Sequence, residues 1–146
     1  MKKIQLYLLL SALFISCDNN KIEVNCNILE KNGISYMLNG EVFTGNCTIM
    51  TDNIITERRN IKNGLHTNTT GYYPVSGELK FTGGMKNDSV HGKYREYYET
   101  GKVAIKGQFK KGFYDGKWRF LREDGVLTRI TIFKDGQLIS ETDQYQ

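Results

Sequence analysis

The sequence repeats itself with a period of 24 residues through much of its length. Residues that tolerate a positive φ return at Asn53, Gly77, Gly101 and Gly125. Large apolar residues return at Ile61, Met85, Phe109 and Phe133, and a lysine follows each of them. Several independent columns that share one period predict a repeat protein, in which each copy buries its apolar stripe against its neighbours.

Each period has the pattern of two strands and two turns. In the copy that starts at Gly92, residues 92–98 and 103–110 are predicted strands, and residues 99–102 form the turn between them. Alternation in the second strand puts Val103, Ile105 and Phe109 on one face, and Lys106, Gln108 and Lys110 on the other. Gly107 falls on the apolar face, where it permits close approach of a neighbouring side chain. Repeat turns are predicted at Gly77, Gly101, Gly112, Gly125 and Gly136.

The composition supports the same fold class. Nine Tyr and seven Phe favour pleated surfaces, and fifteen Gly with a single Pro favour many tight turns. Ahead of the clear copies, residues 22–28 alternate apolar with polar and predict a lead-in strand. Asn39-Gly40 between two short apolar segments is typical of a two-residue hairpin with a type I′ turn. The chain is therefore predicted to be all-β, with one elongated antiparallel sheet of successive hairpins.

The repeat weakens at its two ends. Residues 51–70 keep the period but replace several glycines with Asn or Thr, so they are interpreted as a decayed copy. The register of the repeats before Gly71 therefore stays open. After Ile139 the sequence is polar, and residues 140–146 are predicted to be a frayed tail.

The first 16 residues have the pattern of a secretory signal peptide. Lys2 and Lys3 precede an apolar run that is too short to span a bilayer, and the run ends at Ser16-Cys17. A small residue followed by Cys resembles the lipobox of bacterial lipoproteins. That resemblance implies cleavage before Cys17, lipidation of its side chain, and anchoring in the bacterial cell envelope. The alternative is an ordinary secretory peptide, in which Cys17 is incidental.

Export bears on the other two cysteines. With Cys17 lipidated, Cys26 and Cys47 form an even pair in an oxidising compartment, where a disulfide can persist. The alternative is that both are small apolar fillers, because sequence separation does not fix the direction of their side chains.

Three segments resemble the variant MORN repeat of bacterial proteins: residues 92–112, 116–136 and 72–87. The resemblance extends over residues 33–139. It implies successive hairpins in one twisted sheet. In that family many bacterial members carry an antitoxin-like description, and other MORN proteins are associated with protein scaffolding and with anionic lipids. The expected division of the chain is a signal peptide (1–16), a lipidated lead-in (17–32), the repeat domain (33–139) and the polar tail (140–146).

Basic and aromatic residues interleave in the second half of the chain. Residues 18–57 contain six acidic and two basic residues, whereas residues 91–129 contain ten basic and five acidic residues. The candidate binding surface comprises Lys93, Tyr94, Arg95, Tyr98, Lys117, Trp118, Arg119 and Phe120. Such interleaving suits stacking combined with charge pairing. The alternative is that the aromatic residues form the packed face of the sheet while the cations are solvated on the opposite face.

Catalytic patterns are weak in this sequence. His66 and His91 occupy neighbouring columns of adjacent copies, but no third ligand has the spacing of a zinc site. The sequence contains no G-x-S-x-G elbow, and its glycines are spaced as turns and are not grouped as a phosphate loop. We therefore expect no enzyme activity, no metal and no cofactor.

The functional hypothesis is a lipid-anchored interaction module at the outer membrane or in the periplasm. Its expected partner is a protein, and the family resemblance implies that this partner could be a toxin that the module neutralises. The alternative is an envelope scaffold or adhesion protein that binds anionic lipid or glycan through its basic aromatic repeats. Nucleic acid is not expected to be a partner, because the chain is predicted to be exported.

Overall fold

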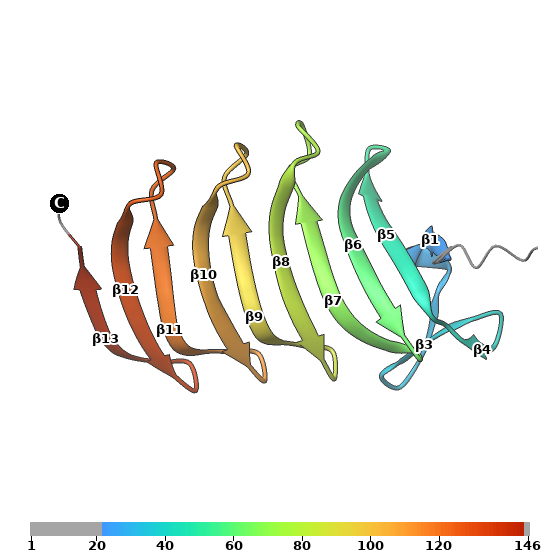
Figure 1. The fold of residues 1–146 in the computed structure, drawn as a ribbon. Coiled ribbons are helices and arrows are strands. Elements are labelled where there is room, and N and C mark those ends of the chain that lie inside the picture. The colour runs from blue at the N-terminus through green and yellow to red at the C-terminus, as the bar shows by residue number, and fades with distance from the viewer. Residues whose placement is uncertain (1–21, 145–146) are drawn as a thin grey trace, which may run out of the picture.

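The computed structural model describes residues 22–144. Ten strands form one large open sheet, whose spatial order is β1-β5-β6-β7-β8-β9-β10-β11-β12-β13. Three short strands form a second sheet, in the order β2-β3-β4. The prediction of an all-β fold with successive hairpins is confirmed, and Figure 1 shows the hairpins side by side along the sheet. Within residues 22–144, no helix is long and apolar enough to cross a membrane. The signal peptide (1–16) and Cys17 lie outside the described residues.

The strand bounds follow the repeat. The large sheet contains β1 (Glu23–Asn25), β5 (Gly45–Thr51), β6 (Ile54–Lys62), β7 (Leu65–Tyr72), β8 (Leu79–Lys86), β9 (Ser89–Tyr97), β10 (Val103–Lys110), β11 (Phe113–Leu121), β12 (Leu127–Lys134) and β13 (Gln137–Asp143). From β5 to β13 every neighbouring pair is antiparallel. The decayed copy, residues 51–70, forms β6 and most of β7. These two strands make a hairpin that continues the same sheet.

The two columns of turn residues lie at opposite ends of the strands. One end carries two-residue loops in which both residues have positive φ, as in Lys111 (53°) followed by Gly112 (87°). This is the type I′ geometry, whose twist matches that of the flanking strands. At the other end, φ is 62° at Asn53, 72° at Gly77, 81° at Gly101 and 89° at Gly125. One 24-residue period therefore corresponds to one hairpin together with the loop that connects it to the next hairpin.

The predicted lead-in strand is too long. Only Glu23–Asn25 is extended, as β1, and Cys26–Ile28 form a short 3₁₀-helix. The side-chain oxygen of Asn25 accepts a hydrogen bond from the Asn27 N–H at 2.9 Å, which gives the backbone a local alternative to a strand ladder. In addition, β1 pairs with β5 in parallel, which is the one exception in the otherwise antiparallel sheet.

A disulfide bond joins Cys26 to Cys47 and so ties the 3₁₀-helix to β5. The Cys47 side chain is completely buried. The bond therefore lies at the end of the large sheet where β1 is the edge strand.

The small sheet covers the beginning of the large one. It consists of β2 (Glu30–Asn32), β3 (Ser35–Leu38) and β4 (Glu41–Val42), and the turn between β3 and β4 has positive φ at Asn39 and Gly40, as the sequence predicts. Its core is a cluster of Tyr36, Phe43 and Ile61, with Val24, Leu29 and Leu38 packed around it. Two backbone hydrogen bonds of 2.8 Å, from Tyr36 to Gly64 and from Gly64 to Phe43, hold this unit against the β6–β7 turn.

At the other end, the repeat sheet continues past its predicted boundary at residue 139. Strand β13 pairs with β12 as far as Asp143, so residues 140–143 belong to an edge strand and not to a frayed tail. The polar side chains have partners there, because Arg129 pairs with Glu141 at 3.4 Å and with Asp143 at 3.7 Å. Charged side chains on an edge strand also discourage edge-to-edge aggregation.

Candidate functional site

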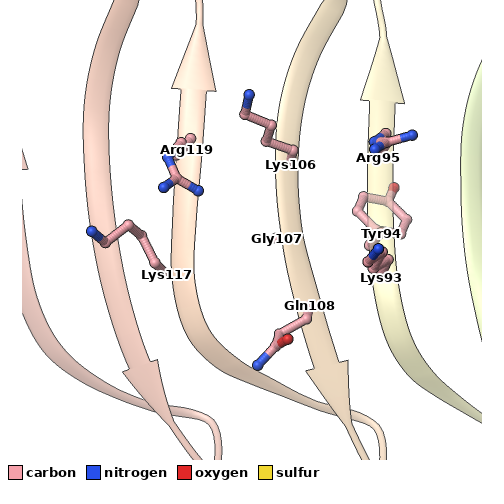
Figure 2. Close-up of a pocket in the computed structure, with 8 residues that line it drawn as sticks. All are labelled: Lys93, Tyr94, Arg95, Lys106, Gly107, Gln108, Lys117 and Arg119. Atoms are coloured by element: carbon pink, nitrogen blue, oxygen red, sulfur yellow. The ribbon is translucent and has the colours of Figure 1, made fainter.

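Five cations share one face of the sheet over β9, β10 and β11. Lys106 lies directly opposite Arg95 on one side and Arg119 on the other, and directly paired residues point to the same face. Lys93 and Lys117 are two residues from these arginines, so the strand period of two places them on the same face. We call Lys93, Arg95, Lys106, Lys117 and Arg119 the basic surface, and Figure 2 shows all five.

The basic surface borders a shallow hollow with a volume of about 310 Å³, which Gln108 also lines. None of its five cations takes part in an ion pair with another residue between 22 and 144. The carboxylate of Asp115 lies on this face too, where it accepts a hydrogen bond from Gln108 at 3.2 Å. Five like charges held this close together create a positive potential that attracts anions.

The opposite face carries a row of aromatic rings. Neighbouring ring centroids are 4.7–6.1 Å apart along Phe81, Tyr94, Phe109, Trp118, Tyr114 and Phe133. Trp118 is only 2% exposed, and its indole N–H donates to the Gln108 carbonyl oxygen at 3.2 Å. The indole lies so close to Gly107 that a Cβ at that position would overlap it, as the sequence pattern predicts.

The candidate surface from the sequence is therefore divided between the two faces. Its four cations belong to the basic surface, whereas Tyr94, Trp118 and Phe120 lie on the aromatic face. Tyr98 lies just after β9, and its hydroxyl donates to the Leu121 carbonyl oxygen at 2.8 Å. Residues that are adjacent in sequence point in opposite directions along a strand, so this separation follows from the backbone geometry.

Sequence reasoning missed Lys106 as a member of the site. Alternation in residues 103–110 did assign its side chain to the polar face. The sequence alone does not give the register between strands, and it is the register that places Lys106 between Arg95 and Arg119.

The two histidines make separate structural contacts. His66 is 7% exposed, and its Nε2 lies 3.0 Å from the Asn68 carbonyl oxygen and 2.9 Å from the Thr69 hydroxyl. His91 Nδ1 accepts a hydrogen bond from the Lys111 N–H at 3.3 Å. In the part of the chain that the structure describes, no group of three or more His, Cys, Asp or Glu is arranged to hold a metal ion.

His66 should make folding stability depend on pH. Burial, followed by the nearby Arg59 charge, lowers the pKa of His66 below its ordinary value. The unfolded chain therefore binds a proton at His66 more readily than the folded chain does. The stability that neutral His66 contributes is complete above about pH 6.5 and falls as the pH drops further. We expect the stability advantage of the wild type over His66→Gln to shrink between pH 7.5 and 5.5, by at most about 1.4 kcal/mol per pH unit. Urea unfolding of both proteins at each pH measures this difference, and a constant difference would contradict the prediction.

The geometry defines a class of protein, an open sheet built from repeated β-hairpins that presents two chemically different faces. Within this class, residues 90–111 match the family model described as MORN repeat variant. This match confirms the predicted MORN repeat, and it spans β9 and β10, which carry three of the five cations of the basic surface. A MORN repeat indicates a protein- or lipid-interaction module. No curated protein and no solved structure matches the chain.

Proposed function

We propose that the chain is a non-enzymatic interaction module of the bacterial cell envelope, which binds an acidic protein partner through the basic surface. The observation that carries this proposal is the group of five cations that have no ion-pair partner among residues 22–144. Six other Lys and Arg residues of this region do pair with carboxylates, for example Lys110 with Asp135 at 3.1 Å. Clustered cations without such partners are available to a carboxylate-rich surface.

Two further features favour a protein partner. Arginine is enriched at protein interfaces, and the basic surface offers Arg95 and Arg119 on either side of Lys106. The aromatic row on the opposite face fixes the strands that carry these side chains, so the cations are presented by a packed sheet. The family resemblance suggests that the partner is a toxin, and the basic surface suggests that the toxin is acidic where it binds. Neutralisation would follow if binding covered that acidic surface.

The proposal includes the membrane anchor. The lipobox-like end of the leader at Ser16-Cys17 supports cleavage and lipidation at Cys17, which would hold the sheet at the envelope. Strong anchoring raises the local concentration of the module near partners that enter the periplasm.

Anionic lipid or glycan is the second candidate ligand. Arg95, Lys106 and Arg119 lie on three adjacent strands, so neighbouring positions along this row are about 4.8 Å apart. A regular row of cations on an open sheet face suits a surface with repeated negative charges, such as lipid headgroups.

The test compares two variants with the same change in charge. Lys93→Gln, Arg95→Gln, Lys117→Gln and Arg119→Gln together remove four cations from the basic surface. The matched control removes four exposed lysines from strand ends and turns: Lys62→Gln, Lys86→Gln, Lys102→Gln and Lys134→Gln. Both variants and the wild type are expressed at full length, crosslinked in the native envelope and purified, and the captured proteins are quantified.

The wild type and the control should capture the same acidic protein, and the yield should fall steeply with added salt. The surface variant should lose at least about nine-tenths of that yield, because several charge contacts of about 1 kcal/mol or more disappear together. Equal capture by all three proteins would refute the protein-binding role of this face. Binding to vesicles of anionic lipid, with the same dependence on the four residues and no captured protein, would support the second candidate instead. The intact mass of the purified protein tests lipidation at Cys17.

A further inference from the structure

The aromatic face contains a groove of about 380 Å³ that the proposed function does not use. The groove lies over β9 to β12. Its lining consists of Val90, Tyr94, Glu96, Ile105, Phe109, Tyr114, Trp118, Phe120 and Phe133. Six of these nine residues are aromatic, and Glu96 is the single charged residue among them. The groove is therefore an apolar trough with one carboxylate in its wall.

The rings of the groove are held firmly by one another. Trp118 makes edge-to-face contacts with Phe109 and Tyr114, at centroid distances of 5.0 and 4.7 Å. Tyr94 makes a similar contact with Phe109 at 5.4 Å. Such packing fixes ring orientation, and the π faces of aromatic rings carry partial negative charge. A fixed set of ring faces favours a cation over a neutral group of the same shape.

Glu96 is the unusual member of this face. Its carboxylate accepts a hydrogen bond from the Tyr94 hydroxyl at 3.3 Å, and it forms no ion pair with any residue in 22–144. Other carboxylates on the same face do have cationic partners. Glu57 pairs with Arg59 at 2.6 Å, and Glu141 pairs with Arg129 at 3.4 Å. A half-buried carboxylate in an apolar wall is stabilised when a cation joins it.

The chain itself shows which arrangement fits such a site. In three places a cation lies over an aromatic ring and also pairs with a carboxylate. These are Lys31 over Tyr36 with Asp88, Arg58 over Tyr72 with Glu23, and Arg129 over Phe120 with Glu141. The cation lies 4.9, 5.9 and 5.1 Å from the ring centroid, respectively. Glu96 has the carboxylate and the rings of this arrangement, and no Lys or Arg between residues 22 and 144 pairs with it.

We propose that this groove binds an arginine side chain presented by a partner protein. Glu96 provides the counter-charge, and the partly exposed rings of Tyr94, Phe109 and Tyr114 provide the apolar walls and π faces. A protein segment suits the site because the groove is open along the sheet, so a neighbouring surface can cover a side chain that has entered it. The site lies on the face opposite the basic surface, so it binds independently of the proposed function.

Trp118 provides a direct readout, because it is the only tryptophan of the chain and it lines the groove. The full-length protein is titrated with the peptide acetyl-Gly-Gly-Arg-Gly-Gly-amide while tryptophan fluorescence is recorded. The matched peptide carries citrulline in place of arginine, which keeps the shape and removes the charge. A third titration uses tetramethylammonium chloride at the same ionic strength. The arginine peptide should bind about tenfold more tightly than the citrulline peptide.

Two variants test whether Glu96 is the source of the preference for arginine over citrulline. Glu96→Gln keeps an acceptor for the Tyr94 hydroxyl but removes the charge, and it should abolish the preference for arginine over citrulline. The matched control is Glu99→Gln, which changes an exposed turn residue whose carboxylate accepts from Ser76 at 2.9 Å; it should keep the preference. An unchanged tryptophan emission maximum shows that each variant retains the packed groove.

Three outcomes would overturn the proposal. Equal affinity of the wild type for the two peptides would do so without any variant. A full preference for arginine in Glu96→Gln would show that the charge acts elsewhere. Saturable binding of tetramethylammonium without any binding of the arginine peptide would identify a site for small free cations and would exclude the protein segment.

Discussion

Replacing Trp118 by alanine should lower the free energy of unfolding by about 3–5 kcal/mol. The indole is 2% exposed and contacts Tyr94, Phe109 and Tyr114. Alanine would remove these contacts and leave Gly107 facing an empty space, because neither position then has a side chain large enough to fill it. The Gln108 carbonyl oxygen would also lose its hydrogen bond from the indole.

Urea unfolding followed by far-ultraviolet circular dichroism measures this loss, since the variant no longer has a tryptophan signal. Phe113→Ala is the matched control, because it also truncates an aromatic residue of β11 but one that is 58% exposed. The control should change stability by less than about 1 kcal/mol. Similar losses in the two variants would mean that the aromatic row does not hold the repeats together.

Removing the disulfide by the double change Cys26→Ala and Cys47→Ala should cost about 3 kcal/mol of stability. The two cysteines are 21 residues apart, and the bond restricts the unfolded chain over this segment. It also joins the 3₁₀-helix to β5, at the edge of the sheet where the parallel strand β1 pairs with β5. In a repeat array each unit is stabilised mainly by its neighbours, so the loss should concentrate at this end of the sheet.

Hydrogen exchange measured by mass spectrometry tests where the loss occurs. In the double variant, exchange should accelerate first in residues 22–50, while β9 to β12 stay protected. Treatment with dithiothreitol should give the wild type the same pattern and leave the variant unchanged. Uniform acceleration along the whole chain would contradict a local role for the disulfide.

The division of the sheet into two faces connects these stability predictions with binding. Tyr94 of β9 and Trp118 of β11 support the sheet from one side, and Lys93 and Arg95 of β9 extend from the other side. A change on the aromatic face should therefore weaken binding on both faces, whereas a charge change on the basic surface should leave stability nearly intact. This asymmetry distinguishes residues that build the surface from residues that contact a partner.

Much of the fold could be predicted from particular columns of the sequence. Asn53, Gly77, Gly101 and Gly125 all have a positive φ, as their shared column predicted. Strand alternation in a single segment predicted a close approach at Gly107, and the structure identifies Trp118 as the side chain that makes it. The candidate site was predicted less well, since its list of residues mixed Lys93 and Arg95 with Tyr94 from the other face.

The two errors at the ends have separate causes. The alternation in residues 22–28 is compatible with a strand, but the Asn25 side chain and the bond to Cys47 favour a 3₁₀-helix after Asn25. The polar residues after Ile139 lack the apolar alternation of a strand, yet β12 offers them an open edge and a cation at Arg129. In the first case the deciding hydrogen bond joins residues two positions apart, and in the second the deciding partner is the other strand of the same hairpin.

The amino-acid sequence by itself determined the hairpins, their period and the side of each strand on which a residue lies, because turn conformation and alternation depend on near neighbours. The tertiary structure alone decided that Lys106 joins two arginines from other strands, that Cys26 meets Cys47, and that Glu96 lies among aromatic rings with no ion pair to a residue in 22–144. Those relations depend on the register between strands, and register is set by the packing of the whole sheet.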